Sequence, residues 1–106
     1  MDYGLSERSE DMRMVMICYN EAIDDEVMET LGECALKNYT KVMGVFGRGE
    51  GSGTHLGNDI WPGRNNLLYI ACDDGAAERL LGCVKGLRAQ YRDEGIKAFC
   101  WRIDAY

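Results

Sequence analysis

The sequence is poor in positive charge and in long apolar runs. It has 12 Lys and Arg against 18 Asp and Glu, a net charge of −6. Binding nucleic acid or an anionic membrane surface requires clustered cations, so neither partner is expected. No apolar run reaches transmembrane length, and the polar first dozen residues lack the apolar stretch of a signal peptide. We therefore predict a cytoplasmic protein with no membrane insertion.

Histidine and proline are almost absent, and the single copy of each falls in one segment. Residues 47–63 read GRGEGSGTHLGNDIWPG and hold 6 of the 13 glycines of the chain. The glycine offsets do not fit GxGxxG, and no Gly-Lys-Ser/Thr follows, so the common phosphate-binding loops are excluded. A loop this long is usually functional or disordered. We predict that residues 47–66 form a ligand- or partner-binding loop, the alternative being a solvated hairpin tip.

Cysteine is not scarce, but its pattern is uninformative. The five cysteines are an odd number and form no CxxC pair. Most fall in apolar runs or on apolar helix faces, which favours small buried side chains in a reducing compartment. Metal thiolates and a redox pair are the alternatives.

The remaining sequence alternates strand and helix patterns after an acidic tail. Residues 1–11 have almost no apolar anchor and are predicted to be disordered. Short β-branched or aromatic runs predict strands at 13–19, 39–46, 67–72 and 97–103. Apolar residues at helical spacing predict helices at 24–37 and 76–91. Within the second helix, Gly82 and Gly86 lie four apart, which favours close packing against a neighbour.

The order β-α-β-β-α-β predicts an α+β, ferredoxin-like fold in a single domain over residues 12–106. Its four-stranded antiparallel sheet carries both helices on one face, and the long loop joins strands two and three. The strands carry apolar residues on both faces, so the face without helices has to be shielded from water. A second subunit is the simplest way to shield it, and we expect an oligomer.

The loop supplies the candidate site residues. Exposed glycine amides and flanking guanidinium groups suit an anion. The ligand-binding candidates are Gly47, Arg48, Gly49, Gly51 and Arg64. The candidates for contact with a partner are Ser52, Thr54, His55, Asn58 and Trp61, although Trp61 also fits a plug that packs the base of the loop.

Metal binding and catalysis find little support in these residues. His55 is a weak metal candidate because it lacks an HxxxH or HxE partner and would need Glu50, Asp59 or a second subunit. No nucleophile, acid and base can be assembled around it, so we predict no enzyme.

Residues 13–106 resemble the PII-like signalling family. The resemblance rests on the element order and on three stretches, TKVMGVFGRGEGSG, GTHLGNDIWPG and NNLLYIACDD. It implies a homotrimer with sheets facing inward, effectors bound in clefts between subunits, and a long loop, the T-loop, that reaches partner proteins. By position, Gly47, Arg48, Gly49 and Gly51 form the start of the loop base, and Arg64 forms its end.

The chain also departs from the nitrogen-sensing PII proteins and resembles a divergent subgroup. Those proteins carry a Gln at the start of the loop, where Arg48 and Glu50 stand here, and a modifiable Tyr that residues 47–66 lack. Their Gly- and Lys-rich loop before the last strand is replaced by the short acidic YRDEGIK. Sensing of 2-oxoglutarate, uridylylation and the standard ATP site are therefore not expected.

Together these points predict a regulatory homotrimer that binds a small effector, such as an adenine nucleotide or another anion. Its 47–66 loop would contact a protein or transporter partner. Two alternatives remain open at this stage. One is a metal-binding trimer of the CutA type that uses His55, and the other is an interaction module without a ligand.

Overall fold

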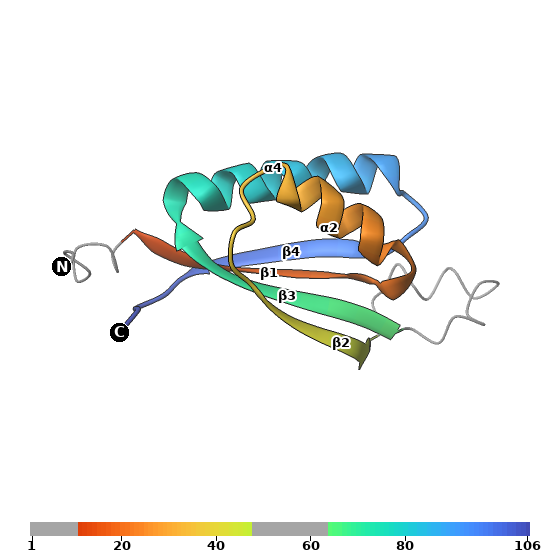
Figure 1. Cartoon of the computed structure of the whole chain (residues 1–106), viewed down its shortest axis with the longest axis horizontal. Helices are drawn as coiled ribbons and strands as arrows, with labels where there is room; N and C mark the ends of the chain where they lie inside the picture. The colour runs from red at the N-terminus through yellow and green to blue at the C-terminus, as the bar shows by residue number, and fades with distance from the viewer. Residues whose placement is uncertain (1–10, 48–63) are drawn as a thin grey trace.

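The computed structural model describes residues 11–47 and 64–106, which form one four-stranded sheet and two α-helices (Figure 1). The strands are β1 (Met12–Asn20), β2 (Thr40–Phe46), β3 (Arg64–Asp73) and β4 (Ile96–Arg102). They pair antiparallel in the order β2-β3-β1-β4. The α-helices are α2 (Asp24–Gly32), preceded by the short 3-10 helix η1 (Glu21–Ile23), and α4 (Asp74–Gln90). The predicted ferredoxin-like α+β fold is confirmed.

Both helices cover the same face of the sheet, and the core lies beneath them (Figure 1). Alternate strand residues point to opposite faces, so Val15, Ile17 and Tyr19 of β1 all reach the helices and are fully buried. Leu68 and Ile70 of β3 do the same. The helices contribute the stripes that the sequence predicted, Val27 and Leu31 from α2 and Leu80, Val84 and Leu87 from α4.

The opposite face of the sheet is covered by none of the described elements, and we call it the bare sheet face. Cross-strand register aligns its side chains in rows, with Met16 between Tyr69 and Phe99, and Met14 between Ala71 and Trp101. The bare sheet face is defined by six large apolar residues: Met14, Met16, Leu67, Tyr69, Phe99 and Trp101. Phe99 is 51% exposed and Trp101 is 45% exposed. This surface is the feature of the fold that most needs a partner.

Several element boundaries differ from the sequence prediction, two of them by three residues or more. The first helix ends at Gly32 and not at residue 37, because Cys34 N and Leu36 N both donate to Leu31 O and close the helix early. Residues 33–39 therefore form a connection to β2, which we call the α2–β2 connection. The third strand begins at Arg64 and not at residue 67, because Asn65 and Asn66 pair with β1.

The second helix is longer at its start than predicted, since Asp73 accepts a hydrogen bond from Ala76 N and caps it. The close packing predicted for Gly82 and Gly86 does not occur within one copy of the chain. Both residues are exposed, and a methyl group added at either would meet nothing within 4 Å. Neither described helix is long and apolar enough to cross a membrane.

The cysteines also depart from the expectation of free buried thiols. Cys34, in the α2–β2 connection, forms a disulfide with Cys83 of α4. Cys18, Cys72 and Cys100 are free thiols, each partly buried. The predicted disordered tail lies almost wholly outside the described residues, which start at Asp11, and it stays a prediction.

Candidate functional site

The base of the predicted loop is where β2 ends and β3 begins. Of the predicted ligand-binding residues, the structure places Gly47 directly after β2 and Arg64 as the first residue of β3, paired with Phe46. Gly47 and Arg64 are both exposed at the same end of the sheet. The other candidates lie outside the described residues and remain predictions: Arg48, Gly49, Gly51, Ser52, Thr54, His55, Asn58 and Trp61.

Gly47 lies close to the first residues of β3. A Cβ built on it would lie 3.0 Å from Nδ2 of Asn65. Real Cβ atoms rarely come so close, so a larger residue would need the end of the Asn65 side chain to shift by a few tenths of an ångström. The loop base is thus closely packed at this position.

A buried polar cluster supports this end of the sheet, and we call it the Asp24 network. Oδ1 of Asp24, the first residue of α2, accepts from Tyr19 Oη at 2.5 Å and from Asn66 Nδ2 at 3.1 Å. Lys41 Nζ lies 2.6 Å from the same oxygen. One carboxylate oxygen therefore joins β1, β2, β3 and α2 next to the loop base.

Asn66 extends the Asp24 network to an irregularity in β2. Its Oδ1 accepts from the backbone N–H of Gly44 at 3.3 Å, and the side chain is 1% exposed. Gly44 has a φ of +69°, and the pairing of β2 with β3 shifts register between Val42 and Val45. This is a β-bulge, for which a glycine at positive φ is well suited. The buried Asn66 amide therefore has a partner for both of its polar atoms, because Oδ1 accepts from the bulge and Nδ2 donates to Asp24.

The charges of the network follow from these contacts. Burial opposes ionisation of Asp24, but hydrogen bonds from Lys41, Tyr19 and Asn66 outweigh it and hold its pKa below the ordinary value. Burial, and then the neighbouring Asp24 carboxylate, raise the pKa of Tyr19. The network is therefore an ionised carboxylate paired with an ammonium and a neutral phenol near neutral pH.

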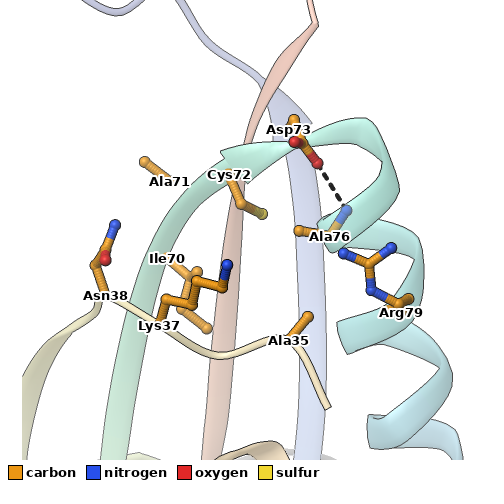
Figure 2. Close-up of a pocket in the computed structure, with 9 residues that line it drawn as sticks. All are labelled: Ala35, Lys37, Asn38, Ile70, Ala71, Cys72, Asp73, Ala76 and Arg79. Atoms are coloured by element: carbon orange, nitrogen blue, oxygen red, sulfur yellow. Dashed lines mark hydrogen bonds between the residues drawn. The ribbon is translucent and has the colours of Figure 1, made fainter.

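A second candidate region lies at the opposite end of β3 (Figure 2). It is a pocket of about 200 Å³ between the α2–β2 connection, the end of β3 and the first turns of α4. We call it the Lys37–Arg79 pocket. Its lining is Ala35, Lys37, Asn38, Ile70, Ala71, Cys72, Asp73, Ala76 and Arg79.

The chemistry of the Lys37–Arg79 pocket suits an anion. Figure 2 shows the Lys37 and Arg79 side chains extending over it from the connection and from α4. In the described part of the chain neither cation has an ion-pair partner. Two nearby acids are paired with Arg13, since Arg13 Nε lies 2.7 Å from Asp74 Oδ1 and Arg13 Nη1 lies 3.0 Å from Glu78 Oε2. A third acid, Asp73, lines the pocket itself and accepts a hydrogen bond from Ala76 N. The hydrogen bond from Arg13 lowers the pKa of Asp74.

The pocket is smaller than a nucleotide site within one copy of the chain. Ligand pockets for molecules of drug size measure roughly 300–1,000 Å³. The loop base cannot complete it in the same copy, because the two regions lie at the two ends of β3, a strand of 10 residues. At about 3.3 Å per residue they are roughly 30 Å apart. A ligand that touches both regions has to lie between two copies.

The sequence pointed to the loop base but missed the other functional candidates. The helix predicted over residues 24–37 includes Lys37, and Arg79 has no local signal because the pocket forms only when the connection folds against α4. The loop predicted over residues 47–66 includes Asn66, although its alternation with Leu68 and Ile70 is a strand pattern that identifies it. Among the described residues no group of three His, Cys, Asp or Glu could hold a metal, and His55 lies outside them.

Comparison with known proteins identifies the fold. No family profile and no curated protein sequence matches the chain. Among solved structures, a protein described as PII-like and signalling, from Thermus thermophilus, superposes with a TM-score of 0.61 at 18% identity, over 85% of this chain and 83% of that one. CPII of Thiomonas intermedia, a nitrogen regulatory PII-like protein solved with ADP and bicarbonate, gives 0.60 at 14% identity over 89% of each chain.

A third structure, of a Pediococcus pentosaceus protein of unknown function, gives a TM-score of 0.59 at 9% identity over 92% of this chain and 96% of that one. These likenesses extend over most of each chain, so the described elements share the fold of the PII-like proteins. The identities are low enough that the fold is what they show.

Proposed function

We propose that the chain is a divergent PII-like regulatory protein, not an enzyme, that assembles as a homotrimer through the bare sheet face. It binds a small anionic effector between copies and contacts a partner protein through the 47–66 loop. The observation that carries the proposal is the bare sheet face, which has six large apolar side chains and lies between two candidate binding regions.

The apolar character of that face supports assembly. A monomer rarely exposes a continuous apolar patch of this kind, because each Å² of apolar surface removed from water contributes roughly 25 cal/mol. Lys97, paired with Cys18, is the single charged residue among its inner positions on β1, β3 and β4. A second copy of the same face can cover this surface without burying a cluster of unpaired charges.

The effector site would form between two copies, with the Lys37–Arg79 pocket from one copy and the loop base from the other. The Lys37–Arg79 pocket supplies two cations, and the loop base of a neighbouring copy would supply Arg64, Gly47 and the predicted Arg48, Gly49 and Gly51. Guanidinium groups and exposed glycine amides bind phosphate or carboxylate. The similar fold of CPII was solved with ADP and bicarbonate, so adenine nucleotides and bicarbonate are the first ligands to test.

Isothermal titration of the purified chain with ADP, ATP, AMP, bicarbonate and inorganic phosphate tests the effector. The proposal expects saturable binding of at least one of them, weakened about tenfold or more by Lys37→Ala or Arg79→Ala, since a charged hydrogen bond contributes about 1.5–3 kcal/mol. Lys85→Ala is the matched control, because Lys85 is an exposed lysine of α4 outside the pocket.

Size-exclusion chromatography with light scattering tests the trimer in the same preparation. A monomer at all concentrations, with no anion bound, would contradict the proposal. Binding of divalent metal that His55→Ala abolishes would favour a metal-binding trimer of the CutA type instead. Capture of a partner by the loop in the absence of every ligand would favour a pure interaction module.

A further inference from the structure

The Cys34–Cys83 disulfide joins two parts of the chain that also form opposite walls of the Lys37–Arg79 pocket. Cys34 lies in the α2–β2 connection directly before the pocket residue Ala35, and Cys83 lies about one helical turn after Arg79 on α4. Three other cysteines stay as thiols in the same chain. In a reducing compartment, which the composition predicts, disulfides are rare, and those that form are usually transient and catalytic or redox-sensing.

We propose that Cys34 and Cys83 form a reversible thiol–disulfide switch that sets the position of the α2–β2 connection and, through it, the width of the pocket. The inference does not depend on the identity of any effector. Its chemistry needs only a small disulfide, such as glutathione disulfide, as the oxidant.

The oxidation is balanced as two thiol–disulfide exchanges. One cysteine thiolate attacks a sulfur of glutathione disulfide, forms a mixed disulfide and releases one glutathione. The second cysteine thiolate attacks the protein sulfur of that mixed disulfide, closes the Cys34–Cys83 bond and releases the second glutathione. The two cysteines lose two electrons in total, and their two protons end on the two glutathione thiols.

The geometry explains why the bond selects one position of the connection. The Cα atoms of Cys34 and Cys83 are 6.8 Å apart, at the outer limit of what a disulfide spans. A small outward shift of the connection takes the sulfurs out of reach, so the bond holds the connection against α4. Both sulfurs belong to partly exposed residues, which small thiols can reach.

The rest of the fold does not need this bond, which allows the switch to operate without unfolding. Both helices anchor to the core independently, α2 through Val27 and Leu31 and α4 through Leu80 and Leu87, all at most 1% exposed. Residues 33–39 contain no regular secondary structure. Besides the disulfide, they are held by the hydrogen bonds from Cys34 N and Leu36 N to Leu31 O and by packing of Ala35 and Leu36 on the core, so opening the bond is expected to shift the connection locally and not to release it.

Cys72 provides a built-in reporter of the pocket. It lines the pocket, and burial, followed by the neighbouring Asp73, raises the pKa of its thiol, so its basal alkylation is slow. Cys18 lies on the bare sheet face, away from the pocket, where the proposed assembly would cover it; an unchanged rate at Cys18 therefore serves as the internal control that the assembly stays intact. Alkylation by N-ethylmaleimide, resolved by peptide mass spectrometry, follows both thiols separately.

The experiment equilibrates the full chain in glutathione buffers from strongly reducing to strongly oxidising and measures the state of the pair and the Cys72 alkylation rate. We expect the pair to pass from mostly dithiol to mostly disulfide, and Cys72 to react at least about fivefold faster in the dithiol form, as in local opening. The rate at Cys18 should not change.

The double variant Cys34→Ser/Cys83→Ser should alkylate at Cys72 at the fast rate in every buffer, while Cys100→Ser keeps the redox dependence. A pair that stays oxidised or stays reduced in all buffers would overturn the switch. Equal Cys72 rates in the two forms of the wild-type chain would overturn its link to the pocket, and this comparison does not depend on whether the double variant folds.

Discussion

The two faces of the sheet are formed by the same strands but differ in how far their side chains are buried within one copy of the chain. On the helix face, Val15, Ile17 and Leu68 are fully buried within one copy of the chain. On the bare sheet face, Met16 and Tyr69, each one residue away along β1 and β3, are partly exposed, and Phe99 and Trp101 of β4 are about half exposed. In the proposed trimer, folding and assembly would therefore depend on alternate residues of the strands, and a substitution on one face should leave the other process largely intact.

The faces differ in polarity as well. The helix face buries the Asp24 network, whose polar atoms are satisfied by Tyr19, Lys41 and Asn66. The inner positions of the bare sheet face are almost wholly apolar. A buried polar network specifies one arrangement, because each donor fits one acceptor, whereas an apolar face gains mainly from area. The network fixes the strands at the loop base, and in the proposed assembly the apolar face would supply affinity between copies.

The largest effect should come from placing charge on the bare sheet face. We expect Phe99→Lys/Trp101→Lys to abolish assembly, because burying each unpaired ammonium costs several kcal/mol. The fold should persist, since neither residue belongs to the buried core. Light scattering measures the mass and circular dichroism the fold. Ala89→Lys/Gln90→Lys, which adds the same charge to exposed positions of α4, should leave assembly unchanged, and an intact oligomer in both variants would refute the separation of faces.

A cavity under the helices should affect folding and not assembly. Leu68→Ala removes a fully buried side chain and should lower the free energy of unfolding by about 2–5 kcal/mol. Urea denaturation of the Phe99→Lys/Trp101→Lys background measures this without the concentration dependence of an oligomer. Met16→Ala in the same background should cost clearly less, and equal losses would mean that both faces are buried within one copy.

The Asp24 network should make stability depend on pH. The folded pKa of Asp24 lies below its unfolded value, so its contribution is present above the unfolded value, about 3.9, and is lost as pH falls through the folded pKa. We expect Asp24→Asn to cost about 1–3 kcal/mol near pH 7 and the two proteins to converge in acid. Asp25→Asn, at the exposed neighbouring position, is the control. It should hardly change the free energy of unfolding near pH 7, so no difference from the wild-type chain remains to disappear in acid.

The element order and both helix stripes could be predicted from the sequence because each depends on local periodicity. The bare sheet face was also predictable, since strands apolar on both sides beside two helices leave one side without cover. The end of α2 was not predictable, because its closure depends on hydrogen bonds to Leu31 O that helical spacing in residues 33–37 does not reveal.

The candidate site was less predictable than the fold. Glycine density indicated the loop base, and Gly47 and Arg64 lie at the same end of the sheet. The hydrogen bond between Asn66 and Asp24 joins residues 42 positions apart, and the Lys37–Arg79 pocket joins residues about 40 apart. Such contacts are set by the tertiary fold, and no local pattern encodes them. The Cys34–Cys83 bond, 49 residues apart, escaped prediction for the same reason.

The smallest effect on stability is expected on the outer surface of α4, which belongs to neither face of the sheet. Gly82 and Gly86 are exposed, have open space around them and weaken the helix, so Gly82→Ala and Gly86→Ala should each stabilise the chain by about 0.5–1 kcal/mol. Thermal denaturation of the oligomer measures the shift. If either substitution instead weakens assembly or stability, a surface comes close to this glycine row. The helices would then carry an interface of their own, and the division between a folding face and an assembling face would no longer describe the molecule.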